Sequence, residues 1–596
     1  MTAYTAPVRD MKFVIEELAD LSLINQLPGL QDATADLVEQ ILEQASRMGS
    51  EVLAPINQSG DQHGVTFKEG NVYAPPGFKD AYQTFVESGW PALPFDPDRG
   101  GQGLPELIAT AVNEIWQSAN MAWSLCPMLT EGAVITLETH ALKTIKDLYL
   151  PKLISGEWTC TMNLTESQAG SDLAAIKTRA TQDGDHYLIT GQKIFITWGD
   201  HDLSENILHL VLARLADAPP GIKGISLFLV PKFLVSPDGS LGERNDVYPV
   251  SIEHKLGIHA SPTCVMSFGD QHGAIGYLVG EEHNGLACMF TMMNHARLAV
   301  AVQGLGISER AYQQALAYAK ERVQGKSNTQ QGRVTIIHHP DVRRMLMLMK
   351  AGTEAMRALC YVTATSLDYS NRTEDESFKT KHLQLFALLT PAVKGWCSEL
   401  AQEITSLGIQ IHGGMGYIEE TGAAQHLRDA RITTIYEGTT GIQAQDLTDR
   451  KIIRDNGKTI SSLLDTMRET ADSLSQLDDN NSTIIHSHYT EAIEALAQAV
   501  SWLLDNYKDD INAPGSISYD FMMLTGTVCG GWQMARSAIV AHNKLNDASE
   551  SHKDFYRTKQ MTARFYAEHI LPRASSYLKT ILTGSESIMS INTDQF

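Results

Sequence analysis

The hydrophobic period of this chain changes along its length, and these changes limit the folds that it can adopt. Up to about residue 155 apolar residues recur at helical spacing. From about 156 to 280 the spacing becomes two, which is typical of β-strands. Helical spacing returns from 284 to about 446 and continues from about 450 to 596. The pattern predicts a mainly α protein with a central β domain.

We expect four domains, with boundaries where the period changes. They are an N-terminal helical domain with a leader, a middle β domain that is a small antiparallel barrel or sandwich, a helical bundle, and an additional C-terminal helical domain. Their predicted ranges are residues 1–155, 156–282, 283–448 and 449–596.

Individual elements follow from the same pattern. Turn-forming Asp-Gly, Pro-Gly and Gly-Asp pairs separate candidate strands over residues 187–190, 193–197, 207–213 and 224–231. A long helix is expected from Leu383 to Ile404, with a kink at Pro391. In the last region we expect helices over residues 460–474, 489–507, 519–545 and 552–582.

The composition excludes several classes of protein. Hydrophobic residues make up 43% of the 596 residues and charged residues 20%, which permits large cores and argues against disorder. The formal net charge of −23 repels phosphate, so nucleic acid and anionic membranes are disfavoured as partners.

Cysteine usage and hydropathy indicate a cytoplasmic protein without a membrane span. The seven cysteines are scattered without CxxC pairs, which is typical of reduced thiols and suggests no metal site. The first ten residues contain no apolar signal core. The most apolar run, 286–307, is interrupted by Asn294, His295 and Arg297.

The strongest functional signal lies between residues 410 and 440. Residues 410–417 read QIHGGMGY, in which the glycine pair ends a helix, and residues 435–440 read IYEGTT. Glu437 therefore lies between an aromatic residue and a glycine. A lone glutamate in such a turn is usually solvated, but Ile435 and Tyr436 are apolar neighbours that would desolvate it. Thr440 and Gln443 fit a capping box, so we expect a helix to begin immediately afterwards.

A second candidate segment joins the first helical domain to the strands. Residues 162–172 read MNLTESQAGSD, in which small residues allow a ligand to approach the backbone and Thr165 and Ser171 add hydroxyl donors. Taken alone, this is equally well an ordinary domain-joining turn. Residues 193–197, KIFIT, follow on a candidate strand. A Rossmann-type GxGxxG motif does not follow any predicted strand.

Together these segments resemble the acyl-CoA dehydrogenase family over nearly the whole chain. The resemblance implies an N-terminal helical domain, a middle antiparallel β-barrel and a C-terminal helical bundle, here with an extra C-terminal helical domain. It also implies FAD as the cofactor, held by turns and helix ends. In this family the glutamate that matches Glu437 removes the α-proton of an acyl-CoA thioester.

The resemblance also assigns residues to the cofactor. Phe195 stands where the family often has tryptophan against the flavin ring, and it keeps a flat apolar face. Arg322 matches an arginine that reaches a pyrophosphate, often across a subunit interface. The residues expected to bind FAD are Met162, Leu164, Thr165, Ser171, Phe195, Ile196, Thr197, Arg322, Gln410, Gly413, Gly414 and Thr439.

On the substrate side, the resemblance places Ser171, Asn294 and Arg297 near the CoA moiety, with Asn294 where an aspartate is common. The implied reaction gives a trans-2-enoyl-CoA and passes electrons to an electron-transfer flavoprotein. The N-terminal leader and C-terminal extension resemble the large bacterial subgroup that includes 3-methylmercaptopropionyl-CoA dehydrogenases and broad-range fatty acyl-CoA dehydrogenases. A homo-oligomer is expected, with a dimer favoured over a tetramer.

Three alternatives remain at this stage. An acyl-CoA oxidase would differ in oxygen access, which the sequence hardly reports. A non-catalytic DNA-associated member is disfavoured, because residues 451–596 hold 13 Lys and Arg against 18 Asp and Glu. A helical scaffold leaves the joint presence of Thr165, Ser171, Arg322, Gln410 and Glu437 unexplained.

Overall fold

The computed structural model describes residues 4–327, 331–545 and 549–596. Contacts divide the chain into two compact units. Unit 1 contains Met1–Gln44, Pro105–Ser118 and Val300–Phe596, and unit 2 contains Ala45–Leu104 and Ala119–Ala299. The four sequence-based domain ranges stay a prediction, since this division follows spatial contacts and cuts through two long helices, α6 (Glu106–His140) and α8 (Gly285–Glu321).

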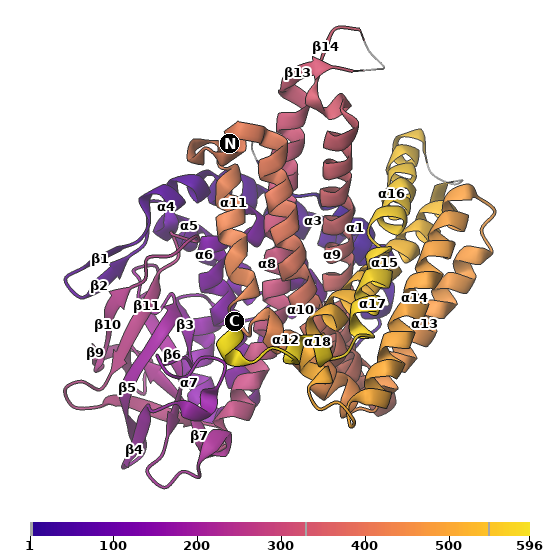
Figure 1. The fold of residues 1–596 in the computed structure, drawn as a ribbon. Helices are drawn as coiled ribbons and strands as arrows, with labels where there is room; N and C mark the ends of the chain where they lie inside the picture. Colours follow the sequence, from indigo (N-terminus) through magenta and orange to yellow (C-terminus); the bar gives the residue numbers. More distant parts are fainter. Residues whose placement is uncertain (1–3, 328–330, 546–548) are drawn as a thin grey trace. The chain divides into compact units, whose positions relative to one another are not determined.

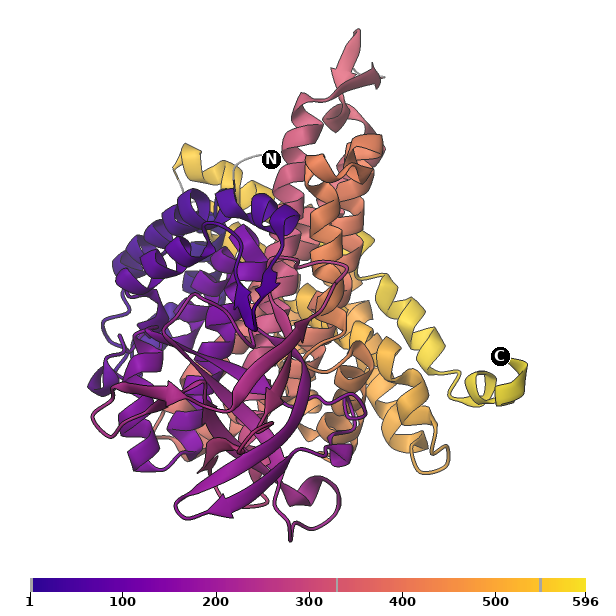
Figure 2. The same cartoon turned by 90° about the vertical axis from the view of Figure 1, so that its left-hand side faces the viewer.

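Unit 2 contains the central β domain, whose strands cross one another in Figure 2. One hydrogen-bonded path runs β10-β11-β5-β12-β7-β6-β3, and β4 pairs with both β5 and β6. The pairs among β4, β5, β12, β7 and β6 therefore form a closed ring, which makes the domain a barrel. The strands are β3 (Trp158–Asn163), β4 (Arg179–Asp183), β5 (His186–Thr197), β6 (Asn206–Arg214), β7 (Ile225–Pro231), β10 (Val247–Ile252), β11 (Thr263–Phe268) and β12 (Ala274–Val279).

The barrel is antiparallel in most of its pairs but not in all. β3 pairs with β6 in parallel, from Trp158 opposite Asn206 to Asn163 opposite Val211, and the single β4–β6 pair is also parallel. The β4–β5 hairpin lies between β3 and β6 in sequence, and β6 then runs in the same direction as β3. The candidate strands over 187–190 and 193–197 are one strand, because Gly191 and Gln192 stay paired with β11.

The barrel interior is apolar, as the period of two predicts. Fully buried members include Ile189, Val211, Phe228, Cys264 and Phe268. Outside the barrel, unit 2 contains α4 (Asn57–His63), α5 (Phe78–Glu87), α7 (Lys143–Ile154), and the small hairpins β1–β2 (Thr66–Lys68, Asn71–Tyr73) and β8–β9 (Phe233–Val235, Leu241–Arg244).

Unit 1 is helical and includes the extra C-terminal region. In Figure 1 the orange and yellow helices α13 to α17 lie beside α9 and α10, and α15 packs against both of these helices. The main helices are α9 (Pro340–Arg372), α10 (Glu376–His412), α11 (Ala423–Ala430), α12 (Thr440–Gln445), α13 (Lys458–Ser475), α14 (Asn480–Asn506), α15 (Ala513–Leu545), α16 (Glu550–His569) and α17 (Arg573–Ile581). Shorter helices are α1 (Val8–Phe13), α2 (Leu21–Ile24) and α18 (Glu586–Met589). Helix α3 (Ala35–Arg47) runs across the boundary between the units. Strands β13 (Val323–Lys326) and β14 (Arg333–Thr335) form a hairpin.

Two proline residues have different effects on these helices. α10 continues through Pro391 as one element, with Phe386, Thr390, Val393, Ala401 and Ile404 buried as the period predicts. Leu383, expected on the same stripe, is 44% exposed. The expected single helix over 552–582 is wrong, because the chain breaks into α16 and α17. Pro572 precedes α17 and cannot supply the amide that a continuous helix needs there.

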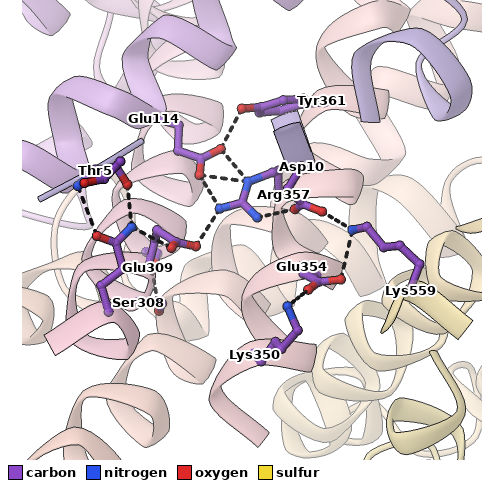
Figure 3. A network of polar contacts seen from close by, with 12 residues as sticks. Thr5, Asp10, Glu114, Ser308, Glu309, Lys350, Glu354, Arg357, Tyr361 and Lys559 are labelled. Carbon is purple, nitrogen blue, oxygen red and sulfur yellow. Dashed lines mark hydrogen bonds and ion pairs between the residues drawn. The ribbon is translucent and has the colours of Figure 1, made fainter. Parts of the chain in front are cut away.

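A buried ion network joins distant parts of unit 1 (Figure 3). Arg357 on α9 binds Glu114 through Nε at 2.9 Å, Asp10 of the N-terminal segment through Nη1 at 2.6 Å, and Glu309 of α8 through Nη2 at 2.7 Å. Asp10 also pairs with Lys559 on α16. The N-terminal segment is therefore tied to the helical core and to the C-terminal region by buried charges.

Helix α8 is unusually long and apolar. It contains an 18-residue window with a mean hydropathy of 1.2, which is long and apolar enough to cross a membrane by composition alone. Inside the protein, 61% of that window is buried, as in the central helix of a globular core.

Candidate functional site

Glu437 lies in a tightly held turn of unit 1 between a short 3-10 helix (Arg431–Thr434) and α12. Its backbone is left-handed, with φ of +56°, and Gly438 follows with φ of +89°. A non-glycine residue in this region costs about 1–3 kcal/mol, so the surroundings must hold it. The strain marks the turn as a candidate functional element.

Two buried side chains hold this turn through its carbonyl groups. Lys394 Nζ, from α10, donates to the carbonyl oxygens of Thr433 at 2.8 Å and Gly438 at 2.7 Å. Gln443 Nε2, from α12, donates to the carbonyl oxygen of Glu437 at 3.0 Å. Lys394 and Gln443 are both fully buried. The position of Glu437 is thus set by α10 and α12 together.

The helix after Glu437 begins one residue earlier than the predicted capping box implies. Thr439 is the N-cap, with its side chain accepting a hydrogen bond from the Ile442 amide at 3.3 Å. The predicted capping box on Thr440 is wrong. Thr440 is already helical and donates to Glu399 Oε1 at 2.6 Å, while Gln443 turns back to the Glu437 carbonyl.

The expected apolar cover of Glu437 is only partly present. The Tyr436 hydroxyl donates to Gln303 on α8, and burial, reinforced by the Glu437 carboxylate, raises the pKa of Tyr436 well above its usual value. Ile435, in contrast, is 48% exposed. The side chain of Glu437 itself is partly exposed.

In unit 2, the segment 162–172 is fixed against strand β5 by a buried ion pair. Lys193 Nζ donates to the Leu164 carbonyl at 3.0 Å and to Glu166 Oε1 at 2.8 Å. Glu166 also accepts from the Thr178 amide at 3.0 Å, and the Ile194 amide donates to the Thr165 carbonyl at 2.9 Å. These bonds place Leu164 and Thr165 beside Lys193 and Ile194, which directly precede Phe195 on β5.

The titration of this pair follows from its burial. Burial opposes ionisation of Glu166, but Lys193 and hydrogen bonds outweigh it and lower the pKa of Glu166 to about 2. Burial lowers the pKa of Lys193 to about 8, with Glu166 opposing the shift. The pair is therefore ionised near neutral pH and rigidifies the segment.

Phe195 presents its ring outward from the barrel. It is 58% exposed, whereas its neighbours Ile196 and Trp198 are buried. Its φ of +60° is unusual for an aromatic residue and turns the side chain away from the alternation of β5. Trp198, with φ of +51°, is held by its indole N–H, which donates to the Ala122 carbonyl at 3.2 Å. An exposed, strained aromatic next to partly exposed Thr165 and Thr197 is suited to a flat ligand.

Arg322 and the glycine pair lie at one end of the helical bundle of unit 1. The rings of Tyr318 on α8 and His412 on α10 stack, with centroids 4.5 Å apart. Arg322 follows the end of α8, Gln410 lies in the last turn of α10, and Gly413 and Gly414 begin the short 3-10 helix (Gly413–Tyr417) that follows α10. Arg322, Gln410 and both glycines are exposed, and a Cβ on either glycine would meet nothing within 4 Å. The structure brings these predicted residues together at an open surface.

The predicted substrate residues differ in their environment. Asn294 and Arg297 lie one turn apart on α8, with Asn294 exposed and Arg297 only 4% exposed. Ser171 is exposed in the segment after β3. Asn294, Arg297 and Ser171 belong to unit 2, whereas Glu437 and Thr439 belong to unit 1.

Sequence reasoning missed four residues that hold these elements in place: Glu166, Lys193, Lys394 and Gln443. A lysine is normally a surface residue, so a buried one has no distinctive local signature. The available signal was the apolar setting of Lys394, which follows Ala392 and Val393 and precedes Trp396. Among residues 4–327, 331–545 and 549–596, no three His, Cys, Asp or Glu side chains come together as a metal site.

Comparison with family models matches three regions of the chain. They are the acyl-CoA dehydrogenase middle domain over residues 161–271, the acyl-CoA dehydrogenase C-terminal domain over 283–452, and an acetyl-CoA dehydrogenase C-terminal-like domain over 463–592. The last match covers the additional helical region.

Similar proteins extend over nearly the full length. The chain is 45% identical to a 3-methylmercaptopropionyl-CoA dehydrogenase of Ruegeria pomeroyi, covering 98% of this chain and 99% of the relative. It is 36% identical to the broad-specificity linear acyl-CoA dehydrogenase FadE5 of Mycobacterium tuberculosis, covering both chains completely. A solved acyl-CoA dehydrogenase complexed with FAD, from Bacillus anthracis, shares the fold with a TM-score of 0.74 at 20% identity, covering 96% of this chain and 91% of that one.

Proposed function

The chain belongs to the acyl-CoA dehydrogenase family and is an FAD-dependent oxidoreductase, and we propose that it oxidises either 3-methylmercaptopropionyl-CoA or a fatty acyl-CoA to the trans-2-enoyl thioester with Glu437 as the base. The single observation that carries the choice of base is the turn of Glu437. Its left-handed backbone is maintained by Lys394 and Gln443 and is followed directly by the N-terminus of α12.

The residues proposed to hold FAD fit such a group. The exposed ring of Phe195 offers a face for a flat ring system, next to the hydroxyls of Thr165 and Thr197. The open space over Gly413 and Gly414 permits a ligand to approach the backbone, and Arg322 supplies a guanidinium suited to a pyrophosphate. The remaining proposed contacts are Met162, Leu164, Ser171, Ile196, Gln410 and Thr439.

The proposed mechanism assigns two tasks to Glu437. When bound, FAD supplies the acceptor for the hydride that leaves the β-carbon. The Glu437 carboxylate accepts the α-proton, and its backbone N–H donates to the thioester carbonyl oxygen, where negative charge develops. A fixed turn is needed, because one residue must present both groups to adjacent atoms of the substrate. Ser171, Asn294 and Arg297 are proposed to bind the CoA moiety.

The substrate proposal has two branches. The higher identity to the Ruegeria pomeroyi protein, 45% against 36%, favours 3-methylmercaptopropionyl-CoA, and the Mycobacterium tuberculosis relative supports linear fatty acyl-CoAs. Both relatives are named dehydrogenases, which favours an electron-transfer flavoprotein over oxygen as the electron acceptor. We also propose a cytoplasmic homo-oligomer, a dimer rather than a tetramer, in which Arg322 and residues 410–414 contact the FAD of a second copy.

The test is anaerobic reduction of the FAD of the purified protein by 3-methylmercaptopropionyl-CoA and by linear acyl-CoAs of increasing length. We expect rapid bleaching with one of the two classes. Absence of bleaching with every acyl-CoA contradicts the proposal. Reoxidation by electron-transfer flavoprotein and by oxygen, compared in the same experiment, decides between a dehydrogenase and an oxidase.

A further inference from the structure

Lys394 combines full burial with a direct connection to the turn that contains Glu437. Its ammonium donates to the carbonyl oxygens of Thr433 and Gly438, at 2.8 and 2.7 Å. These two carbonyls belong to the residues directly before and directly after the segment 434–437. A single side chain from α10 therefore pins both ends of a short segment that belongs to a different element.

Burial of an ammonium group costs free energy unless hydrogen-bond acceptors surround it. Bonds from a charged donor to a carbonyl are roughly twice as strong as neutral ones, so they can hold a backbone in an unfavourable conformation. The turn needs such support, since Glu437 and Gly438 both have positive φ. Gln443, which is also buried, donates through Nε2 to the carbonyl oxygen of Glu437 at 3.0 Å, and Glu437 lies between Thr433 and Gly438.

A purely structural role for Lys394 would be satisfied by any partner in the core. Two of its acceptors are the carbonyls of Thr433 and Gly438, on either side of Glu437, and Gly438 directly follows Glu437. From this we propose that Lys394 is a positioning residue for the reaction, one that fixes the Glu437 carboxylate and backbone N–H relative to the substrate. This inference rests on the proposed function.

The test compares Lys394→Met with the parent enzyme. Methionine preserves the length and apolar volume of the stem but removes the ammonium. A misplacement of about 1 Å in a reacting group costs about 10²-fold in rate. We expect the limiting rate of flavin reduction by acyl-CoA to fall about 10²-fold, while the apparent Kd of the acyl-CoA changes less than about threefold.

A second readout does not depend on activity. Amide hydrogen exchange of peptides that cover residues 431–445 should become faster in Lys394→Met, with peptides from β3 to β12 unchanged. The matched control is Lys559→Met, which removes another buried lysine, one that pairs with Asp10 and Glu354. This control should leave both the reduction rate and the exchange of residues 431–445 unchanged.

The outcomes separate the two proposals. If the parent is reduced and Glu437→Gln is inactive, but Lys394→Met is reduced at the parent rate, the positioning role is overturned and the proposed function stands. If no acyl-CoA reduces the parent, the proposed function itself fails. Loss of FAD from Lys394→Met also overturns the positioning role. Should that variant not fold, Lys394→Gln replaces it, and failure of both to fold assigns Lys394 to the stability of the fold instead.

Discussion

Lys193 Nζ lies 2.8 Å from Glu166 Oε1, with the lysine side chain fully buried and the glutamate side chain 5% exposed. Removal of one partner from a buried pair leaves the other charge uncompensated, at a cost of about 3–5 kcal/mol. We therefore expect Lys193→Met to lower the urea midpoint for unfolding strongly. Lys177→Met is the control, because the Lys177 side chain is exposed and only its amide binds Glu166. Equal midpoints for the two variants would contradict the assignment.

The same pair predicts a loss of stability in acid. The pKa of Glu166 is lowered to about 2 from the 4.5 of an unperturbed glutamate. A lowered folded-state pKa contributes stability above the unfolded pKa, and this contribution is lost as the pH falls from about 4.5 towards 2. The urea midpoint of the parent should fall more steeply over this range than that of Glu166→Gln. Parallel curves would show that Glu166 does not titrate as inferred.

The hydrophobic period of the sequence predicted strands and helices whose formation depends on neighbouring residues. Strands β6 and β7 and helices α13 and α15 lie close to where the hydrophobic period puts them, whereas α14 begins at Asn480, before the predicted start at residue 489. The parallel pairing of β3 with β6 joins residues about 48 positions apart, such as Cys160 and Leu208, and no local period encodes it. The continuity of β5 through Gly191 likewise depends on its pairing with Phe268.

The same distinction holds at the candidate site. The motifs identified Glu437 and Thr165, because glycines and small residues near them are visible in sequence. Lys193 and Lys394 were missed, because a lysine that is buried by distant segments looks like any surface lysine. Their acceptors, such as the Leu164 and Gly438 carbonyls, are backbone atoms that carry no sequence signal.

Phe195 gives a direct test of the proposed flavin face. Phe195→Ala removes an exposed ring from β5, and loss of such an aromatic contact costs about 2 kcal/mol. We expect the Kd of FAD to rise about 30-fold, measured by fluorescence during reconstitution of apoprotein, and Phe195→Trp to stay near the parent. Val250→Ala is the control, since Val250 is similarly exposed at 48% on β10. An unchanged Kd in Phe195→Ala would remove Phe195 from the FAD site.

Arg357 tests the ion network of Figure 3. Its guanidinium binds Glu114, Glu309 and Asp10, and Glu114 is fully buried. Burial raises the pKa of Glu114 although Arg357 opposes this shift. Arg357→Met leaves these carboxylates together, so we expect destabilisation of about 3–5 kcal/mol or more.

The control for Arg357 is an exposed arginine on the same helix. Arg344 pairs with Asp341 at 2.8 Å and is 48% exposed. Arg344→Met should change stability by less than about 1 kcal/mol. Thermal unfolding of the two variants under identical conditions measures the difference, and a similar effect of both would refute the network as a stabilising feature.

Glu437→Gln tests the base itself. Glutamine is nearly isosteric, and the carbonyl of residue 437 should still accept from Gln443, so the fold, FAD and acyl-CoA binding should persist. The amide cannot accept the α-proton. Flavin reduction should therefore fall by a factor on the order of 10³ or more, which is more than about 4 kcal/mol in barrier. Anaerobic stopped-flow reduction measures this step, and Glu419→Gln, at an exposed glutamate, is the control. Reduction of Glu437→Gln at near the parent rate would exclude Glu437 as the base.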